Sequence, residues 1–147
     1  MKRKTPILAA CFVALFAWAG FVFAQTATLG AMKTVKLPNG DLVCDLTGEW
    51  DALIDNYGEW AEFGSYRNII KMTLVGDSFR GIRLLDNGPG EPPNSIVVEI
   101  NPEKNGFKQV FLSEGTSLCL CNGRLSEDGK IIVLDLKNKV KLTMTRK

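Results

Sequence analysis

The sequence of 147 residues contains no histidine. This absence excludes the Ser-His and Cys-His pairs in which a histidine activates a nucleophile, and it excludes every metal site built on imidazole ligands. An excess of charge is also missing, because 18 basic residues stand against 16 acidic ones, a net charge of +2. A dedicated nucleic-acid-binding protein needs a concentrated basic face, so the composition argues against nucleic acid as a partner.

Catalytic motifs are scarce as well. The sequence has no G-x-S-x-G nucleophile elbow and no glycine-rich phosphate loop. Asp51, Asp55 and Glu59 would share one face of a helix, at spacings of i, i+4 and i+8. Glycoside hydrolysis needs two carboxylates that face each other across a cleft, which neighbours on one solvated face do not provide. We therefore predict that the protein is not an enzyme and uses no cofactor.

The first 24 residues have the layout of a secretory signal peptide. Three basic residues at positions 2–4 precede an uncharged stretch from Pro6 to Ala24. Val22 and Ala24 occupy the −3 and −1 positions that a signal peptidase reads, which predicts cleavage before Gln25. The expected location is therefore periplasmic or secreted.

Two alternatives to cleavage stay open. The 19 residues from Pro6 to Ala24 can just span a bilayer, so an uncleaved signal would anchor the protein in the inner membrane, its one route to a membrane. Leu8-Ala9-Ala10-Cys11 also has the outline of a lipobox, which would make Cys11 a lipidated N-terminus. Cleavage before Gln25 would remove three bases and no acids, leaving 15 bases and 16 acids, a net charge of −1.

Three cysteines follow the expected signal, namely Cys44, Cys119 and Cys121. An oxidising compartment favours a disulfide, so we expect one bridge from Cys44 to Cys119 or Cys121 and one buried thiol. A redox-active Cys-x-Cys pair is an alternative, although the sequence shows no helix N-terminus to activate it. A metal site would need a fourth ligand without histidine, so we predict none.

Turn-forming residues divide the rest of the chain into short strands. Residues 25–40 are expected to form a flexible leader that ends in the turn Pro38-Asn39-Gly40-Asp41, and residues 41–147 a single domain. Polar and apolar residues alternate in several segments, as in half-buried strands. We expect strands at 46–52, 66–74, 78–85, 95–100, 107–112, 117–125, 130–136 and 139–145.

The short connections favour sequential antiparallel pairing, and a meander of about eight strands can remove its exposed edges by closing. The predicted fold is therefore all-β, a small closed or nearly closed barrel. Residues 51–63 are the exception, because their apolar residues have helical spacing while Gly58 interrupts them. A short helix or lid and an irregular or strand conformation are both open for this segment.

Charge is distributed unevenly along the predicted domain. Seven acids and no base lie between Leu37 and Tyr66, whereas six bases and one acid lie between Lys130 and Lys147. In a closed barrel the first and last strands are neighbours, so the two segments would neutralise each other across the seam. The alternative is an acidic surface that attracts a cationic ligand or partner.

Leu46-Thr47-Gly48-Glu49-Trp50 resembles the G-x-W signature of lipocalins and other calycin barrels, and of avidin-type barrels. The resemblance implies that Trp50 lies across the closed end of the barrel as a structural plug, with Arg146 of the last strand packed over its ring. The opening D-L-T-G-E-W and closing L-T-M-T-R are also similar to small uncharacterised exported bacterial proteins. That likeness implies a fold and a compartment but no activity.

Five of the eight aromatic residues after position 24 lie between Trp50 and Tyr66. Such rings can line a ligand mouth or stack on a flat ligand, so we predict that a small apolar or aromatic ligand binds here, near the loop 86–94. The candidate ligand-binding residues are Tyr57, Trp60, Phe63 and Tyr66.

The alternative function is an envelope structural or protein-interaction module whose barrel is filled. The two functions differ in the barrel interior. A filled barrel would be packed completely by the inward-facing residues, whereas a binding protein would keep a cavity of a few hundred Å³. The expected inward-facing residues are Ile70, Met72, Leu74, Val140, Leu142 and Met144.

Overall fold

The structure is a computed structural model and describes residues 32–147. The predicted signal peptide, its cleavage site, Cys11 and the first residues of the predicted leader lie outside the described residues.

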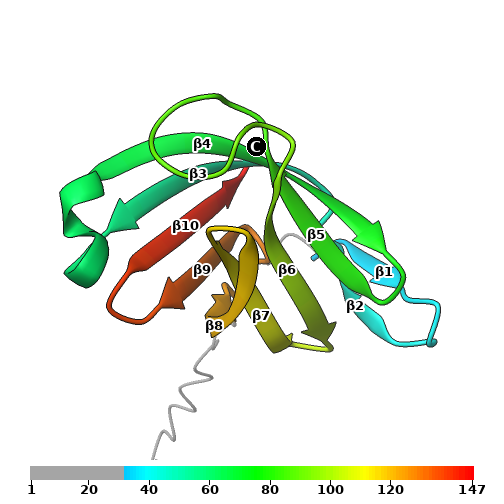
Figure 1. The fold of residues 1–147 in the computed structure, drawn as a ribbon. Coiled ribbons are helices and arrows are strands. Elements are labelled where there is room, and N and C mark those ends of the chain that lie inside the picture. The colour runs from blue at the N-terminus through cyan, green and yellow to red at the C-terminus, as the bar shows by residue number, and fades with distance from the viewer. Residues whose placement is uncertain (1–31) are drawn as a thin grey trace, which may run out of the picture.

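Eight antiparallel strands form a closed barrel in which each strand pairs with its neighbours in sequence (Figure 1). This confirms the predicted all-β meander. The strands are β3 (Gly48–Asn56), β4 (Ser65–Val75), β5 (Ser78–Arg83), β6 (Ile96–Glu103), β7 (Gly106–Glu114), β8 (Ser117–Leu125), β9 (Ile131–Leu136) and β10 (Val140–Arg146). Alternate residues of each strand point inward, which is why period-2 patterns such as Val140, Leu142 and Met144 are buried.

The barrel closes by pairing β10 with β3, and opposite charges meet along this seam. Lys141 stands opposite Asp55 in the register. Lys147 Nζ lies 3.4 Å from Glu49 Oε2. The acidic and basic segments of the sequence therefore do face each other, because closure brings the two ends of the domain together.

A second sheet precedes the barrel, so the described part of the predicted leader forms a strand and a turn from Thr34 onward. Strands β1 (Thr34–Lys36) and β2 (Leu42–Cys44) form an antiparallel hairpin. Leu37 in its turn is buried, and the N–H of Asn39 donates to Asp77 Oδ1 at 3.0 Å in the β4–β5 turn. The hairpin is ordered because its apolar side chains join the core at one end of the barrel.

Residues 51–63 do not form one helix. Strand β3 continues to Asn56, and a 3-10 helix, η1, covers Gly58–Phe63. Asp51 and Asp55 are therefore exposed strand residues and do not share a helix face with Glu59, contrary to the spacing argument. Pairing with β4 and β10 on both edges outweighs the local helical spacing in this segment.

The turn expected at residues 101–106 is shorter than predicted. Strand β6 continues to Glu103, with Pro102 at a shift in register between β6 and β7. A proline lacks the N–H that a regular ladder needs, and such irregularities are where a sheet accommodates it.

Candidate functional site

One end of the barrel is closed by Trp50, which is completely buried. Its indole Nε1 donates a hydrogen bond of 2.9 Å to the carbonyl of Leu46. The guanidinium carbon of Arg146 lies 4.5 Å from the centroid of the indole ring. Arg146 also donates to the carbonyl oxygens of Thr47, at 3.0 Å, and Asp45. This end is therefore a packed structural element.

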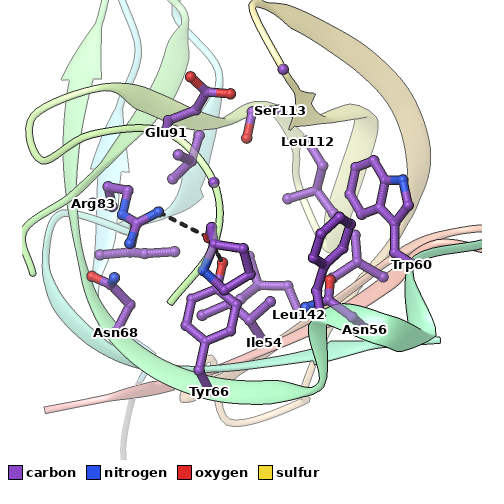
Figure 2. Close-up of a pocket in the computed structure, with 17 residues that line it drawn as sticks. Ile54, Asn56, Trp60, Tyr66, Asn68, Arg83, Glu91, Leu112, Ser113 and Leu142 are labelled. Atoms are coloured by element: carbon purple, nitrogen blue, oxygen red, sulfur yellow. Dashed lines mark hydrogen bonds between the residues drawn. The ribbon is translucent and has the colours of Figure 1, made fainter. Parts of the chain in front are cut away.

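The opposite end holds a cavity of about 300 Å³ (Figure 2). Apolar side chains from four strands make up much of its wall, including Ile54, Ile70, Leu112 and Leu142. Below it the interior is packed, since Met72 and Met144 are almost completely buried and do not line the cavity. The barrel is thus filled in one half and hollow in the other.

Three of the four predicted ligand-binding residues line the cavity, namely Trp60, Phe63 and Tyr66. Tyr57 does not, which departs from the prediction. Its hydroxyl donates to Asp135 Oδ1 at 2.6 Å and accepts the N–H of Asn138 at 2.9 Å. Tyr57 therefore ties the end of β3 to the β9–β10 turn, on the outside of the cavity.

The predicted loop 86–94 covers part of the cavity mouth, where Pro89, Gly90 and Glu91 line the wall. The hydroxyl of Tyr66 donates to the carbonyl of Pro89 at 2.7 Å (Figure 2). Gly88 has a φ of 68° and lies against the ring of Tyr66, so close that a Cβ there would be 2.4 Å from it.

The buried amide of Asn68 holds the start of the same loop. Its Nδ2 donates to the carbonyl of Leu85 at 3.1 Å and to Asn87 Oδ1 at 2.9 Å. Its Oδ1 accepts the backbone N–H groups of Ile69 and Leu85. The amide of Asn68 is thus fully engaged by the protein itself.

Arg83 is a cavity residue that the sequence analysis missed. It is 4% exposed, lines the cavity and comes from the last position of β5. The sequence pattern could have predicted its position, because Phe79, Gly81 and Arg83 are alternate residues of one strand and therefore point to the same side. Phe79 and Gly81 are buried inside the barrel. An arginine at such a position is unexpected, since charged side chains are rarely buried without a partner.

On the other side of the mouth, Lys139 forms an ion pair with Glu114. The Nζ of Lys139 also lies 5.6 Å from the centroid of the Trp60 ring. Cys119 Sγ donates to Glu114 Oε2 at 3.2 Å, and this hydrogen bond raises the pKa of the Cys119 thiol. The thiol is therefore held in its protonated, less reactive form.

All three cysteines of the described chain are free thiols, which corrects the predicted disulfide. Cys44 lies at the packed end against Gly129, whereas Cys119 bonds Glu114 at the opposite end of the barrel. Cys119 and Cys121 are two residues apart on β8, about 6.6–6.8 Å along a strand, near the limit for bridged cysteines. Burial raises the pKa of Cys121 to about 11.

Within residues 32–147, no group of three or more cysteine and carboxylate side chains is arranged to hold a metal ion. Over the same range, no helix is both long enough and apolar enough to cross a membrane.

Comparisons with known proteins found no match for this chain among protein-family models, curated proteins or solved structures.

Proposed function

We propose that this protein binds a small apolar or aromatic ligand inside the barrel, without catalysis, in the periplasm or after secretion. The observation that carries the proposal is the cavity of about 300 Å³, which lies in the same barrel beside the almost completely buried Met72 and Met144. Known ligand sites are concave and mostly apolar, and this volume stands at the lower end of their range. A single ring system or a short apolar chain has the right size.

The lining supports the same proposal. Trp60, Phe63 and Tyr66 supply aromatic surface at the mouth, while Ile54 and Leu142 supply aliphatic surface below. Aromatic rings contribute large apolar contact areas and prefer offset or edge-to-face stacking with other rings. Phe63 is 47% exposed, which leaves its ring available to an entering ligand.

A lipocalin-like architecture is part of the proposal. Its support is the pairing of Trp50 with Arg146 at the packed end, the arrangement that the G-x-W resemblance implies. Small-molecule sites often occupy the mouths of β-barrels, which agrees with the position of the cavity at the other end. The likeness concerns architecture and leaves the ligand to be found by experiment.

One feature favours the second function, docking of an envelope protein. Strand β9 pairs with only one part of β8, residues Asn122–Leu125. Within the described chain, the preceding part of β8, Ser117–Cys121, pairs with β7 alone. Leu120 in this segment is 61% exposed. A strand edge with an exposed leucine is suited to pairing with an extended segment of another protein.

Native mass spectrometry of the protein exported by its own signal tests the first function. We expect a mass excess that disappears when the same sample is denatured, because a copurified ligand is released on unfolding. The denatured mass also shows whether the chain begins at Gln25.

Binding of N-phenylnaphthylamine, an uncharged fluorescent probe, provides a second test that needs no copurified ligand. Phe63→Ala should weaken probe binding by about three- to tenfold, since one ring of the mouth is lost. Phe111→Ala is the matched control, because Phe111 lies on β7 between two buried residues and does not line the cavity. A protein without bound ligand and without probe binding would favour the docking function.

A further inference from the structure

We propose that the ligand is an amphipathic anion whose carboxylate pairs with Arg83 inside the cavity. This inference rests on the proposed binding function and names the chemical class of its ligand. It starts from Arg83, a charged side chain in an otherwise largely apolar cavity (Figure 2).

The charge of Arg83 has no acidic partner in the described chain. Arg83 is 4% exposed, yet none of the ion pairs within residues 32–147 includes it. Glu91 is the acidic residue among those that line the cavity, and it makes no ion pair with Arg83. Burying a cation is costly unless an anion or several dipoles compensate it.

Backbone carbonyls compensate the charge in part. Nε of Arg83 donates to the carbonyl of Leu85 at 3.3 Å, Nη1 to that of Pro89 at 3.3 Å, and Nη2 to that of Asn87. A guanidinium group has five N–H donors, so these three bonds leave two hydrogens on the terminal nitrogens, and the Tyr66 hydroxyl is a further acceptor for one of them. The hydrogen that remains can donate a charge-assisted hydrogen bond to a carboxylate.

Asn68 and Tyr66, the polar side chains beside Arg83, do not compete for an anion. The Nδ2 group of Asn68 already donates both its hydrogens. The hydroxyl of Tyr66 donates to Pro89, and its ring lies 6.0 Å from the guanidinium carbon of Arg83. Arg83 is therefore the cavity group with a spare donor and a full positive charge.

The placement of Arg83 also orients the ligand. Figure 2 shows Arg83 and Asn68 on one side of the cavity and Trp60 on the other, with Ile54 and Leu142 between them. A carboxylate on Arg83 would direct an apolar body across the aliphatic floor toward Trp60. Medium-chain fatty acids and monocyclic aromatic acids have this combination of one anionic end and a short apolar body.

Displacement of N-phenylnaphthylamine by decanoate and by decanol tests the inference, because the two molecules share a chain and differ in charge. We expect decanoate to displace the probe at a concentration about ten- to a hundredfold lower than decanol, the range of a charge-assisted hydrogen bond. Arg83→Met should remove this preference, so that decanoate and decanol displace the probe at similar concentrations. Arg83→Lys should keep only part of the preference, since an ammonium group lacks the planar fork.

Arg80→Met is the matched control. Arg80 lies on the same strand but faces outward, where its Nε lies 3.1 Å from Glu99 Oε2. This variant should keep the preference for decanoate. Glu91→Gln should bind decanoate more tightly than the native chain, because it removes a like charge from the cavity wall.

The native protein alone provides a test that does not depend on how the variants fold. The preference for decanoate should decline as the pH falls below about 4.5, where an ordinary carboxyl becomes increasingly protonated and neutral. The same pH series with Glu91→Gln tests which carboxyl is responsible. If the variant loses the preference over the same pH range, the group that becomes protonated is the carboxyl of the ligand and not that of Glu91. Equal displacement by decanoate and decanol at neutral pH would overturn the inference and leave the binding function intact. Absence of probe binding altogether would overturn the binding function itself.

Discussion

Arg146 and Trp50 stack at the packed end of the barrel, with the guanidinium carbon 4.5 Å from the centroid of the indole ring. The two residues stand opposite each other in the register of β10 and β3, so their contact lies on the seam that closes the barrel. The same guanidinium donates to the carbonyls of Asp45 and Thr47 and thereby fixes the chain that enters β3.

Arg146→Ala should therefore lower the free energy of unfolding by about 2–4 kcal/mol, because it removes the cation–π contact and two charge-assisted hydrogen bonds. Urea denaturation followed by tryptophan fluorescence measures this change. Lys147→Ala is the control, since Lys147 forms an exposed ion pair with Glu49 and should cost less than about 1 kcal/mol. Equal effects of the two variants would show that the stack on Trp50 does not stabilise the seam.

Gly88→Ala should displace the loop over the cavity. Gly88 has a positive φ of 68°, and an added Cβ would lie 2.4 Å from the ring of Tyr66. We expect a loss of about 1–3 kcal/mol in unfolding free energy and weaker binding of N-phenylnaphthylamine. Gly106→Ala is the control, because nothing lies within 4 Å of its Cβ position. Unchanged probe binding in Gly88→Ala would mean that the loop does not shape the cavity.

Asp45 makes stability depend on pH. Burial by itself would raise the pKa of Asp45, but hydrogen bonds from the hydroxyl and N–H of Thr47 and the ion pair with Lys33 lower it below its ordinary value of 3.8. A carboxyl with a lowered folded-state pKa stabilises the protein above its unfolded-state pKa. This stabilisation is lost as the pH falls below about 4 toward the folded-state pKa.

Urea unfolding between pH 7 and pH 3 measures the effect of Asp45. Thr47→Val keeps the shape of the side chain but removes the hydroxyl donor, whose distance to Asp45 Oδ1 is 2.6 Å. We expect Thr47→Val to lose less stability than the native chain on acidification below pH 4. A variant with the same acid dependence as the native chain would show that this hydrogen bond does not lower the pKa of Asp45.

Glu114 should control the reactivity of Cys119. Its hydrogen bond raises the pKa of the Cys119 thiol, so alkylation by iodoacetamide near pH 8 should be slow. Glu114→Gln removes the carboxylate and leaves the cation of Lys139 nearby, so the pKa of Cys119 should fall and its alkylation become several times faster.

Peptide mass spectrometry after timed alkylation measures each cysteine separately. Cys121 serves as an internal reference, because burial raises its pKa to about 11. Glu103→Gln is the control variant, since Glu103 is an exposed residue at the end of β6. A disulfide in the exported protein, or no change at Cys119 in Glu114→Gln, would contradict the arrangement described for this side of the mouth.

The sequence by itself indicated the eight strands of the barrel, their sequential pairing and a closed or nearly closed barrel. The alternation of Val140, Leu142 and Met144 is a local pattern, and the turn residues between segments leave only short connections. The opposite charges near Asp55 and Lys141 also indicated that the first and last barrel strands are neighbours.

Only the tertiary structure decided which side chains meet inside the barrel and how much space they leave. Arg83 lies in the cavity while Tyr57 lies outside it, because the direction of each depends on register and on where β3 ends. The hairpin of β1 and β2 has a local turn signal in Asn39-Gly40, but its place at one end of the barrel is decided by packing of its apolar side chains on the core. Lumen volume depends on the tilt and stagger of all eight strands together, so no local pattern determines a cavity beside a packed core.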